Sequence, residues 1–341
     1  MIRFDCDYLE GGHPSILQRL VETNLEQTIG YGADPYCQAA ADRIRQACNA
    51  PQAAVHFLVG GTQTNTTVIY SLLRPHEGVL CPDSAHINCH EVNAIEGTGH
   101  KVLSLPAEDG KLTAQTIEEA VLAWKEDAAW EHIVKPGMVY LSQATEVGTL
   151  YSKAELTAIR QVCDRYHLPL FLDGARLAYA LGAPENDLTL PDLAQLCDVF
   201  YIGGTKAGAL FGEAVVIPDP GLISGFRSLI KQRGGLLAKG RLLGLQFDAL
   251  FTDDLYFQIG KQAVELALEM KAGFVERGYP LWCDSPTNQQ FPILSQEQAS
   301  RLREDFSFDD FGPVGEGRRV ARFCTSWATT PEQVRRLLNK I

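Results

Sequence analysis

An acidic and a basic residue follow two short apolar segments near the middle of this 341-residue sequence. Asp173 comes directly after the apolar run at 168–172, and Lys206 closes a Gly-Gly-Thr-Lys stretch after the run at 199–202. Each run is too short for a helix and is typical of a buried parallel strand. Because open α/β sheets bind ligands at the carboxyl ends of their strands, we expect the two side chains to share one crevice.

This pair of side chains suits pyridoxal 5′-phosphate. An amine can bind the aldehyde of that cofactor, and a carboxylate can keep its ring nitrogen protonated, so that the ring accepts electrons from a carbanion. Taken singly, Asp173 is more typical of a helix N-cap and Lys206 of a solvated loop. The order of the pair, with Gly174 and Gly203 where a cofactor must approach closely, favours the cofactor site.

A second glycine turn supplies a place for a phosphate. The strand expected at 53–59 leads through Gly60, Gly61 and Thr62 towards a helix expected at 66–73. Unpaired backbone N–H groups and the helix dipole attract anions at such a helix start. The turn lacks the lysine of a Walker A loop and the third glycine of a dinucleotide fingerprint. A monophosphate is therefore the favoured ligand, and a merely structural turn is the alternative.

Composition narrows the class of protein. A net charge of −12 argues against a nucleic-acid partner, which requires a clustered basic face. The N-terminus lacks the charged-then-apolar order of a signal peptide, and no apolar run has membrane-spanning length. Nine cysteines without a C-x-x-C pair indicate reduced thiols. We therefore expect a cytoplasmic protein with a small-molecule substrate and no membrane partner.

Strand and helix patterns alternate from residue 53 to 206, which predicts an α/β fold with a mainly parallel, helix-wrapped sheet. Strands are expected at 53–59, 78–81, 101–105, 137–141, 168–172, 199–202 and 212–217. Helices are expected at 15–25, 36–48, 66–73, 112–128, 153–166 and 256–278, with Thr113 and Ser152 as N-caps and a further helix carrying Glu91.

We predict two domains. Residues 1–254 form a large cofactor-binding domain, of which residues 1–15 are an extended N-terminal segment. Residues 255–341 form a small C-terminal α+β domain, because the runs at 290–294 and 320–325 are typical of antiparallel strands and 331–341 of a closing helix.

The segment at 221–244 is basic in an otherwise acidic chain. Its cationic residues are Arg227, Lys231, Arg233, Lys239 and Arg241. A solvated helix face is one interpretation. The other is a positive loop that reaches a phosphate, including one in a partner subunit.

With these residues in place, the chain resembles the L-threonine aldolases of the β-eliminating lyase family, in the aspartate-aminotransferase superfamily (fold type I). The resemblance is nearly full length. It rests on six short motifs in the expected order, at 30–34 (Gly-Tyr-Gly-Ala-Asp), 61–65 (Gly-Thr-Gln-Thr-Asn), 85–86 (Ala-His), 172–176 (Leu-Asp-Gly-Ala-Arg), 205–206 (Thr-Lys) and 322–325 (Arg-Phe-Cys-Thr). It implies a transferase-like large domain that uses pyridoxal 5′-phosphate to cleave L-threonine or L-allo-threonine to glycine and an aldehyde.

The resemblance also implies roles around the cofactor. Lys206 binds its aldehyde, and Asp173 pairs with its ring nitrogen. Gly61 and Thr62 hold its phosphate. His86 stacks on its ring, near the substrate hydroxyl.

Further roles concern the substrate and the assembly. Arg176 and Arg322 grip the substrate carboxylate, with Arg176 also near a cofactor oxygen, and Tyr31 lines the site. Asp7 is counted among the substrate-binding candidates. Lys239 stands where many relatives carry an arginine, in a loop expected to complete a cofactor or substrate pocket across a dimer interface. Relatives form tetramers built from such dimers.

Two departures from the family pattern leave the general base open. Many aldolases carry a second active-site histidine where this chain has Thr145 and Glu146. A subset of the family resembles this chain at these positions and lacks that histidine. A serine that helps to bind the substrate carboxylate is replaced by Cys6. His86 is one candidate base, directly or through water, because imidazoles titrate near neutral pH. Glu146 is the other, provided that burial raises its pKa.

Several alternatives use other chemistry. β-Elimination from a hydroxy- or thio-amino acid, or folate-dependent hydroxymethyl transfer, would employ the same lysine and aspartate. A metal site formed by Cys81, His86, Cys89 and His90 matches no usual zinc spacing. A nicotinamide oxidoreductase does not fit the glycine turn, and a non-catalytic binding protein does not explain the full set of cofactor-contacting residues.

Overall fold

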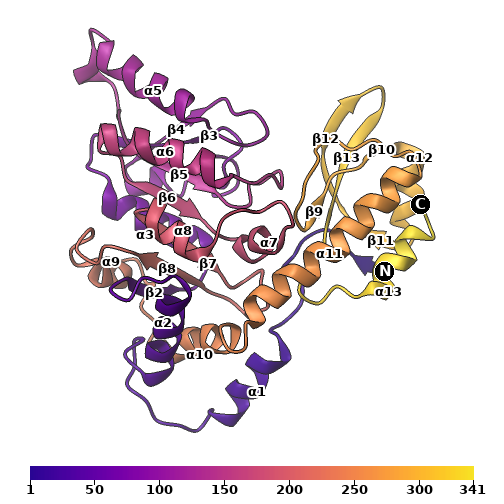
Figure 1. The fold of residues 1–341 in the computed structure, drawn as a ribbon, viewed down its shortest axis with the longest axis horizontal. Coiled ribbons are helices and arrows are strands. Elements are labelled where there is room, and N and C mark those ends of the chain that lie inside the picture. Colours follow the sequence, from indigo (N-terminus) through magenta and orange to yellow (C-terminus); the bar gives the residue numbers. More distant parts are fainter.

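A seven-stranded sheet forms the centre of the computed structural model, which describes residues 1–341 (Figure 1). Its strand order is β2-β8-β7-β6-β5-β3-β4. The strands are β2 (Ala54–Leu58), β3 (Glu77–Pro82), β4 (Lys101–Leu105), β5 (Lys135–Ser142), β6 (Leu170–Asp173), β7 (Val199–Gly203) and β8 (Glu213–Ile217). Only β8 is antiparallel to its neighbours. The prediction of a mainly parallel sheet is thus confirmed.

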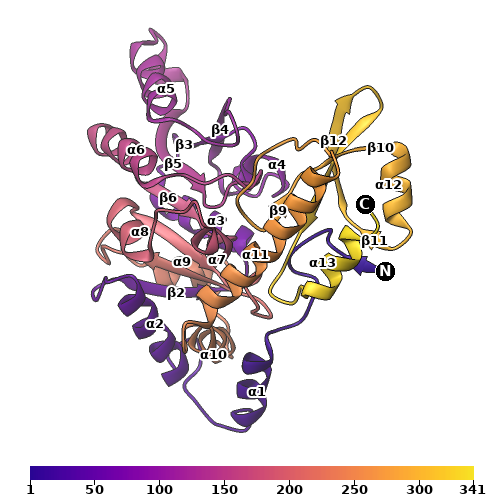
Figure 2. The same cartoon turned by 45° about the vertical axis from the view of Figure 1, so that its right-hand side comes forward.

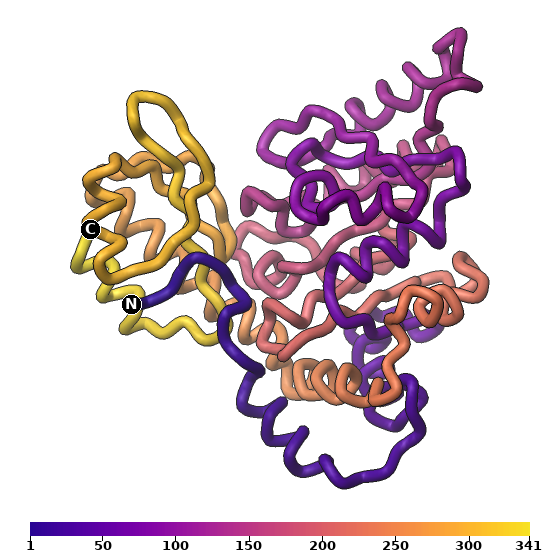
Figure 3. The backbone as a smooth tube through the Cα atoms, turned by 180° about the vertical axis from the view of Figure 1, so that it is seen from behind, coloured from indigo at the N-terminus to yellow at the C-terminus, as the bar shows by residue number.

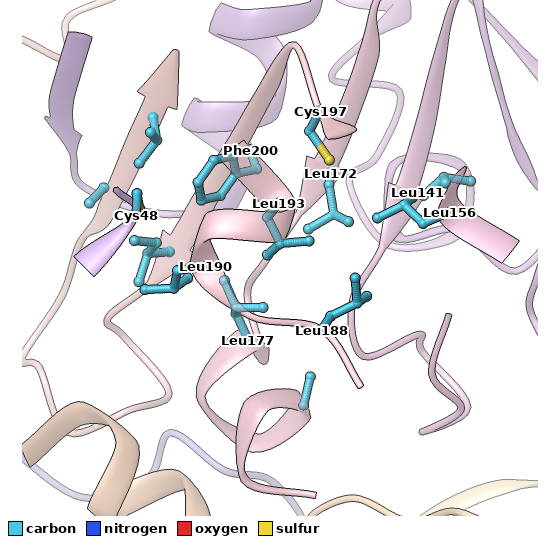
Figure 4. Packing of buried hydrophobic residues seen from close by; sticks show 14 of the residues in the cluster. Cys48, Leu141, Leu156, Leu172, Leu177, Leu188, Leu190, Leu193, Cys197 and Phe200 are labelled. Carbon is cyan, nitrogen blue, oxygen red and sulfur yellow. The ribbon is translucent and has the colours of Figure 1, made fainter. Parts of the chain in front are cut away.

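Successive residues of the central strands pack on opposite faces of the sheet, as the period of a strand requires. Leu141 and Leu172 belong to the core on one face, beneath the helices α5 (Ala114–Glu126) and α6 (Lys153–Tyr166), while Tyr140 and Phe171 belong to the core on the other. Figure 4 shows part of the first core, including Leu172, Phe200 and residues of α6 and of α8 (Leu190–Leu196). Burial on both faces explains why these strands are continuous apolar runs.

Helices cover both faces of the sheet. One face packs against α2 (Pro35–Ala47), α5 (Ala114–Glu126), α6 (Lys153–Tyr166), α7 (Leu177–Gly182), α8 (Leu190–Leu196) and α10 (Arg241–Leu250). The other packs against α3 (Gly61–Leu72), α4 (His86–Cys89) and α9 (Phe226–Gln232). The predicted N-caps are confirmed, since Thr113 and Ser152 both accept backbone N–H groups of the helices that follow.

A smaller layer follows the large sheet. The helix α11 (Leu255–Glu276) leads to it and runs alongside its strands (Figure 2). Here β10 (Ile293–Ser295), β12 (Asp309–Gly315) and β9 (Gln289–Gln290) all pair antiparallel with β13 (Arg318–Cys324). The remaining helices are α12 (Gln296–Arg303) and α13 (Pro331–Leu338). The antiparallel pairing predicted for this region is confirmed, and the domain boundary at 255 stays a prediction.

The N-terminal segment joins the two parts. Its first strand, β1 (Ile2–Arg3), pairs parallel with β11 (Phe306–Ser307), and Phe4 is buried in the core of the smaller layer. From there the chain passes to α1 (Pro14–Glu22) below the large sheet (Figure 3). The start of the chain is therefore held against its last third.

Some local features differ from the sequence prediction. The helix predicted at 66–73 begins earlier, at Gly61, because the glycine turn itself forms its first turn. The prediction of a helix carrying Glu91 is wrong. α4 ends at Cys89, and Val92 and Asn93 have left-handed backbones that stop a helix. The strand β12 was not predicted. No helix is long and apolar enough to cross a membrane.

Candidate active site

A cavity of about 290 Å³ opens at the carboxyl ends of β5, β6 and β7. It brings together most of the residues predicted for the site. These are Gly61, Thr62, His86, Glu146, Asp173, Arg176 and Lys206. The parallel strands end on one edge of the sheet, which is why residues from distant parts of the sequence meet there.

Asp173 is the most firmly held of these residues. Tyr201 and the backbone N–H of Ala175 donate to its Oδ1 at 2.5 and 2.9 Å. Tyr140 and Asn65 donate to its Oδ2 at 2.5 and 3.1 Å. The two tyrosines come from the strands on either side of β6, so the sheet itself fixes the carboxylate. These four donors hold the carboxylate in one orientation, in which its oxygens act as hydrogen-bond acceptors.

Gly174 allows the chain to turn directly after this carboxylate. A Cβ atom at that position would lie 1.9 Å from the carbonyl oxygen of Tyr201, closer than non-bonded atoms can approach. Only glycine fits between the ends of β6 and β7. The glycine after Asp173 therefore brings the carboxylate close to the strand that leads to Lys206.

Lys206 lies in the loop between β7 and β8. Burial lowers the pKa of its amine, as does the positive charge of Arg176, while Asp7, Asp173 and Glu213 act in the opposite direction. A lowered pKa favours the neutral amine, which is the form that attacks an aldehyde. The surroundings of Lys206 therefore suit a nucleophilic lysine.

Glu213 is a site residue that the sequence analysis missed. Thr205 donates to its Oε1 at 2.8 Å, and the backbone N–H of Gly204 donates to its Oε2 at 3.1 Å. Burial raises the pKa of Glu213, against the opposing effects of the Thr205 hydrogen bond and the Lys206 charge. Burial thus shifts the pKa values of Glu213 and Lys206 towards each other, and both shifts favour the uncharged forms. Its place in an apolar run made Glu213 indistinguishable from an ordinary strand residue.

The first turn of α3 forms one wall of the cavity. Gly60 caps this helix in an extended conformation, and no side chain satisfies its first N–H groups. Gly61 and Thr62 both line the cavity. A helix start with free N–H groups is suited to an anion. Near the other end of α3, the Arg233 guanidinium stacks on the ring of Tyr70, 3.9 Å from its centroid.

Glu146 and His86 stand together on another wall. The backbone N–H of His86 and the hydroxyl of Ser142 both donate to Oε1 of Glu146, at 2.9 and 2.8 Å. Burial raises the pKa of Glu146, and the charge of Asp173 adds to the effect. A raised pKa is the direction of shift that a carboxyl group needs in order to transfer protons closer to neutral pH.

Arg176, three residues after Asp173, also lines the cavity. Its Nε and Nη2 donate to Oδ2 and Oδ1 of Asp7 at 2.8 and 3.1 Å. Asn288 also donates to Asp7 at 2.9 Å. Asp7 is fully buried and does not line the cavity. It therefore holds Arg176, whose Nη1 is left for another partner.

Besides Asp7, three further predicted site residues lie outside this cavity. Arg322 on β13 donates to Asp309 at 2.8 Å. Tyr31 borders a separate cavity beside α2, with the Lys231 ammonium 4.5 Å from its ring. Lys239 lines a third cavity next to Gly30. Within one chain, the loop that contains Lys239 does not reach the site around Lys206.

The alternative of a metal site has no geometric support. No group of three or more His, Cys, Asp or Glu side chains is arranged to hold a metal ion. All nine cysteines are free thiols. Burial raises the pKa of the Cys81 thiol well above its usual range, which disfavours the thiolate that binds zinc.

The residues around the cavity fit pyridoxal 5′-phosphate. Oδ1 of Asn65 and Oε2 of Glu146 are buried without hydrogen-bond partners, and both residues line the cavity. Such atoms call for a polar ligand. The donor set matches the three polar parts of the cofactor: a helix start for its phosphate, a fixed carboxylate for its ring nitrogen, and the Lys206 amine for its aldehyde.

Comparisons with known proteins agree with this geometry. The sequence model of the family described as beta-eliminating lyase matches residues 4–282. A low specificity L-threonine aldolase of Pseudomonas aeruginosa is 33% identical over 348 aligned residues, which cover 99% of this chain and 96% of that protein. Another, from a Pseudomonas species, is 32% identical over 342 residues, covering 98% and 95%.

Solved structures show the same relationship. The threonine aldolase of Leishmania major superimposes with a TM-score of 0.97 at 46% identity, covering 99% of this chain and 98% of that one. A mutant aspartate aminotransferase of Thermus thermophilus gives a TM-score of 0.72 at 13% identity, covering 100% and 90%. The second likeness concerns the fold alone, and it confirms the predicted architecture.

Proposed function

Because the chain belongs to the beta-eliminating lyase family, we propose that it cleaves L-threonine or L-allo-threonine, and related β-hydroxy-α-amino acids, to glycine and an aldehyde. The protein is a pyridoxal 5′-phosphate-dependent lyase of the threonine aldolase type. One observation carries the proposal: Asp173, Lys206, His86 and Glu146 line a single cavity at the carboxyl edge of the sheet. This arrangement supplies a cofactor site and two proton-transferring groups together.

When bound, the cofactor supplies an electron sink for the carbanion left at Cα. Lys206 is the residue for its aldehyde, since its surroundings favour the neutral amine. Asp173 is the residue for its protonated ring nitrogen, since two tyrosines and Asn65 fix the carboxylate. Gly61 and Thr62, at the start of α3, are the residues for its phosphate.

Two arginines are proposed for the substrate carboxylate. Arg176 keeps Nη1 free, because Asp7 occupies its other donors. Arg322 lies on β13. The pKa of His90 is lowered first by burial and by the charge of His86, and then by the charges of Arg322 and Arg176. The fields of the two arginines therefore overlap beside His86. Holding the carboxylate orients the amino acid, and orientation of this kind reduces the barrier by making the encounter intramolecular.

The reaction requires removal of the proton on the β-hydroxyl group. His86 is proposed as the proton acceptor, with Glu146 as the second group close to the hydroxyl. Proton transfer by a positioned side chain contributes about 10²–10⁴-fold to a rate. Glu146 accepts a hydrogen bond from Ser142, and the Oε2 atom of its carboxyl group is buried. Burial raises the pKa of this carboxyl group, which supports a role in proton transfer.

The assembly and the location of the protein are also proposals. Apolar side chains are exposed on α1 and in the loop that follows it, at Leu17, Val21, Leu25, Ile29 and Tyr31. The exposure of these apolar side chains supports a second subunit that covers them, in a homotetramer built from dimers. In such a dimer, Tyr31 and Lys239 would serve the site of the partner subunit. Nine free thiols support a cytoplasmic location.

Product analysis of the purified protein loaded with pyridoxal 5′-phosphate tests the proposal. L-Threonine should yield acetaldehyde and glycine in equal amounts, with a change in the visible absorbance of the cofactor. Pyruvate and ammonia from L-serine, without acetaldehyde from L-threonine, would identify a β-eliminating lyase instead. Lys206→Ala provides the blank, because it should lose both the visible absorbance and turnover.

A further inference from the structure

Glu91 is a buried acid directly beside His86. Its side chain is 0% exposed, whereas the His86 side chain is 40% exposed. The Oε1 atom of Glu91 lies 2.8 Å from Nδ1 of His86. A carboxylate oxygen accepts hydrogen bonds, so this contact requires the proton on Nδ1. The other ring nitrogen, Nε2, is then left without a proton.

Asn65 links the same carboxylate to Asp173. Its Nδ2 donates to Oε1 of Glu91 at 2.8 Å and to Oδ2 of Asp173 at 3.1 Å. Both amide protons are therefore in use. The chain His86–Glu91–Asn65–Asp173 joins α4, α3 and β6 through three hydrogen bonds.

The backbone around Glu91 is shaped for this contact. Val92, the next residue, is 97% exposed and has a φ of 50°. A left-handed conformation is unfavourable for a β-branched residue, and nothing packs on this side chain to require it. The turn instead directs Glu91 inward. The backbone strain at Val92 therefore occurs where it places the Glu91 carboxylate within hydrogen-bond distance of His86.

We propose that Glu91 is a positioning residue that holds His86 with its proton on Nδ1, so that Nε2 is the proton acceptor in the cavity. The catalytic role of Glu91 rests on the proposed aldol cleavage. The tautomer of His86 is independent of the reaction that the protein catalyses. Carboxylates that orient histidines in this manner fix both the tautomer and the ring plane. Through Asn65, the same contact ties the position of the base to the carboxylate proposed for the cofactor ring.

Other charged groups also face His86. The ring of His90 lies 5.5 Å from that of His86, and Glu146 accepts the backbone N–H of His86. Arg176 lines the same cavity, and Asp173 lies at the other end of the chain of hydrogen bonds. Glu91 is the only one of these groups with a hydrogen bond to the imidazole ring. Substitution of Glu91 therefore removes a hydrogen bond to the ring, whereas substitution of the other groups changes only the electrostatic field around it.

The tautomer can be measured without any assay of turnover. In the holoenzyme with ¹⁵N-labelled histidine rings, NMR should show neutral His86 with the proton on Nδ1, its signals being those missing from the spectrum of His86→Asn. In Glu91→Ala the fraction with the proton on Nδ1 should fall. A wild-type spectrum with the proton on Nε2 would overturn the proposal, even if the protein does not cleave threonine.

Kinetics supply the second readout, in variants that keep the shape of the site. Glu91→Gln removes the charge, so protonation of His86 becomes less favourable. We expect kcat for L-threonine to fall about 10- to 100-fold, as for other carboxylates that orient a histidine, with little change in KM. The acid limb of the kcat/KM profile should move to lower pH.

Glu96→Gln is the matched control, because Glu96 is exposed in the same segment and lies outside the cavity. It should behave as wild type in both measurements. If Glu91→Gln and Glu96→Gln give the same kcat and the same acid limb, Glu91 only fills space and the proposal fails.

Discussion

Asp7 and Arg176 form a two-pronged ion pair in which Nε and Nη2 of the arginine meet Oδ2 and Oδ1 of the carboxylate. Both side chains are buried, at 0% and 11% exposure. Burial alone would raise the pKa of Asp7, but the charges of Arg176 and Lys206 hold it at about 2. The pair thus connects the N-terminal segment to the proposed substrate-binding arginine.

This ion pair predicts a particular response to acid. The pKa of Asp7 is lower in the folded protein than its unfolded value of about 3.9. The stability that it contributes is complete above the unfolded pKa and is lost as the pH falls from about 4 towards 2. Asp7→Asn should lower the free energy of unfolding at pH 7 by about 3–5 kcal/mol, since it leaves a buried charge without its partner.

Urea unfolding at several pH values checks this prediction. The variant should show a weaker dependence of stability on pH than the wild type below about pH 4. Asp5→Asn is the control, because Asp5 pairs with the exposed Arg3 and should cost at most about 1 kcal/mol. Equal losses in the two variants would contradict the importance of the buried pair.

The two proton-transferring groups can be separated by substitution. His86→Asn should lower kcat by about 10²–10⁴-fold at saturating cofactor, because it removes the proposed base. Glu146→Gln should lower kcat less, since Gln keeps the hydrogen bonds from Ser142 and the His86 backbone. Steady-state rates with L-threonine decide the matter. A severe effect of the glutamine variant alone would make Glu146 the base and leave His86 as a stacking residue.

Arg322 is predicted to act on the substrate and not on the cofactor. Arg322→Ala should raise KM for L-threonine about 10- to 100-fold, as expected for a lost hydrogen bond between charged groups. Binding of pyridoxal 5′-phosphate, followed by its absorbance, should change little. Arg319→Ala is the control on the same strand, where the side chain pairs with Asp310 on the surface. Equal damage to substrate and cofactor binding would place Arg322 elsewhere in the mechanism.

Gly174 is predicted to admit no side chain. A Cβ atom there would lie 1.9 Å from Tyr201 O, a backbone atom that moves only with β7. Gly174→Ala should therefore cost about 1–3 kcal/mol or more of stability and weaken cofactor binding, because the carboxylate of Asp173 moves with the turn. Thermal unfolding and cofactor titration measure the two effects. Gly97→Ala, at a position with open space, should be close to neutral.

The core of the site is predictable because it depends on local patterns. Asp173 and Lys206 each follow an apolar run, and parallel strands bring such ends together whatever the details of packing. The glycine turn at Gly61 signals an anion site for the same reason. The central strands, buried on both faces, are predictable from their apolar runs alone.

The supporting residues depend on tertiary contacts that no local pattern reveals. Tyr140 and Tyr201 sit inside apolar runs, where a tyrosine is an ordinary strand residue until a carboxylate is found beside its hydroxyl. The sequence predicts a helix at Glu91, because nothing local signals the left-handed backbone of Val92, which a β-branched residue disfavours. The contact of Asp7 with Arg176 joins segments far apart in the sequence, so only the folded chain shows it.

The pairing of β1 with β11 has a consequence for biosynthesis. Ile2 leaves the ribosome long before its partner, Phe306, because all seven strands of the large sheet lie between them in the sequence. Asp7, a few residues further on, cannot be fixed by Asn288 until that late segment is available. The large sheet can assemble during translation, but the active site becomes complete only after the segment that contains Asn288 has left the ribosome. A nascent chain stalled before residue 288 should therefore be folded in part and catalytically silent.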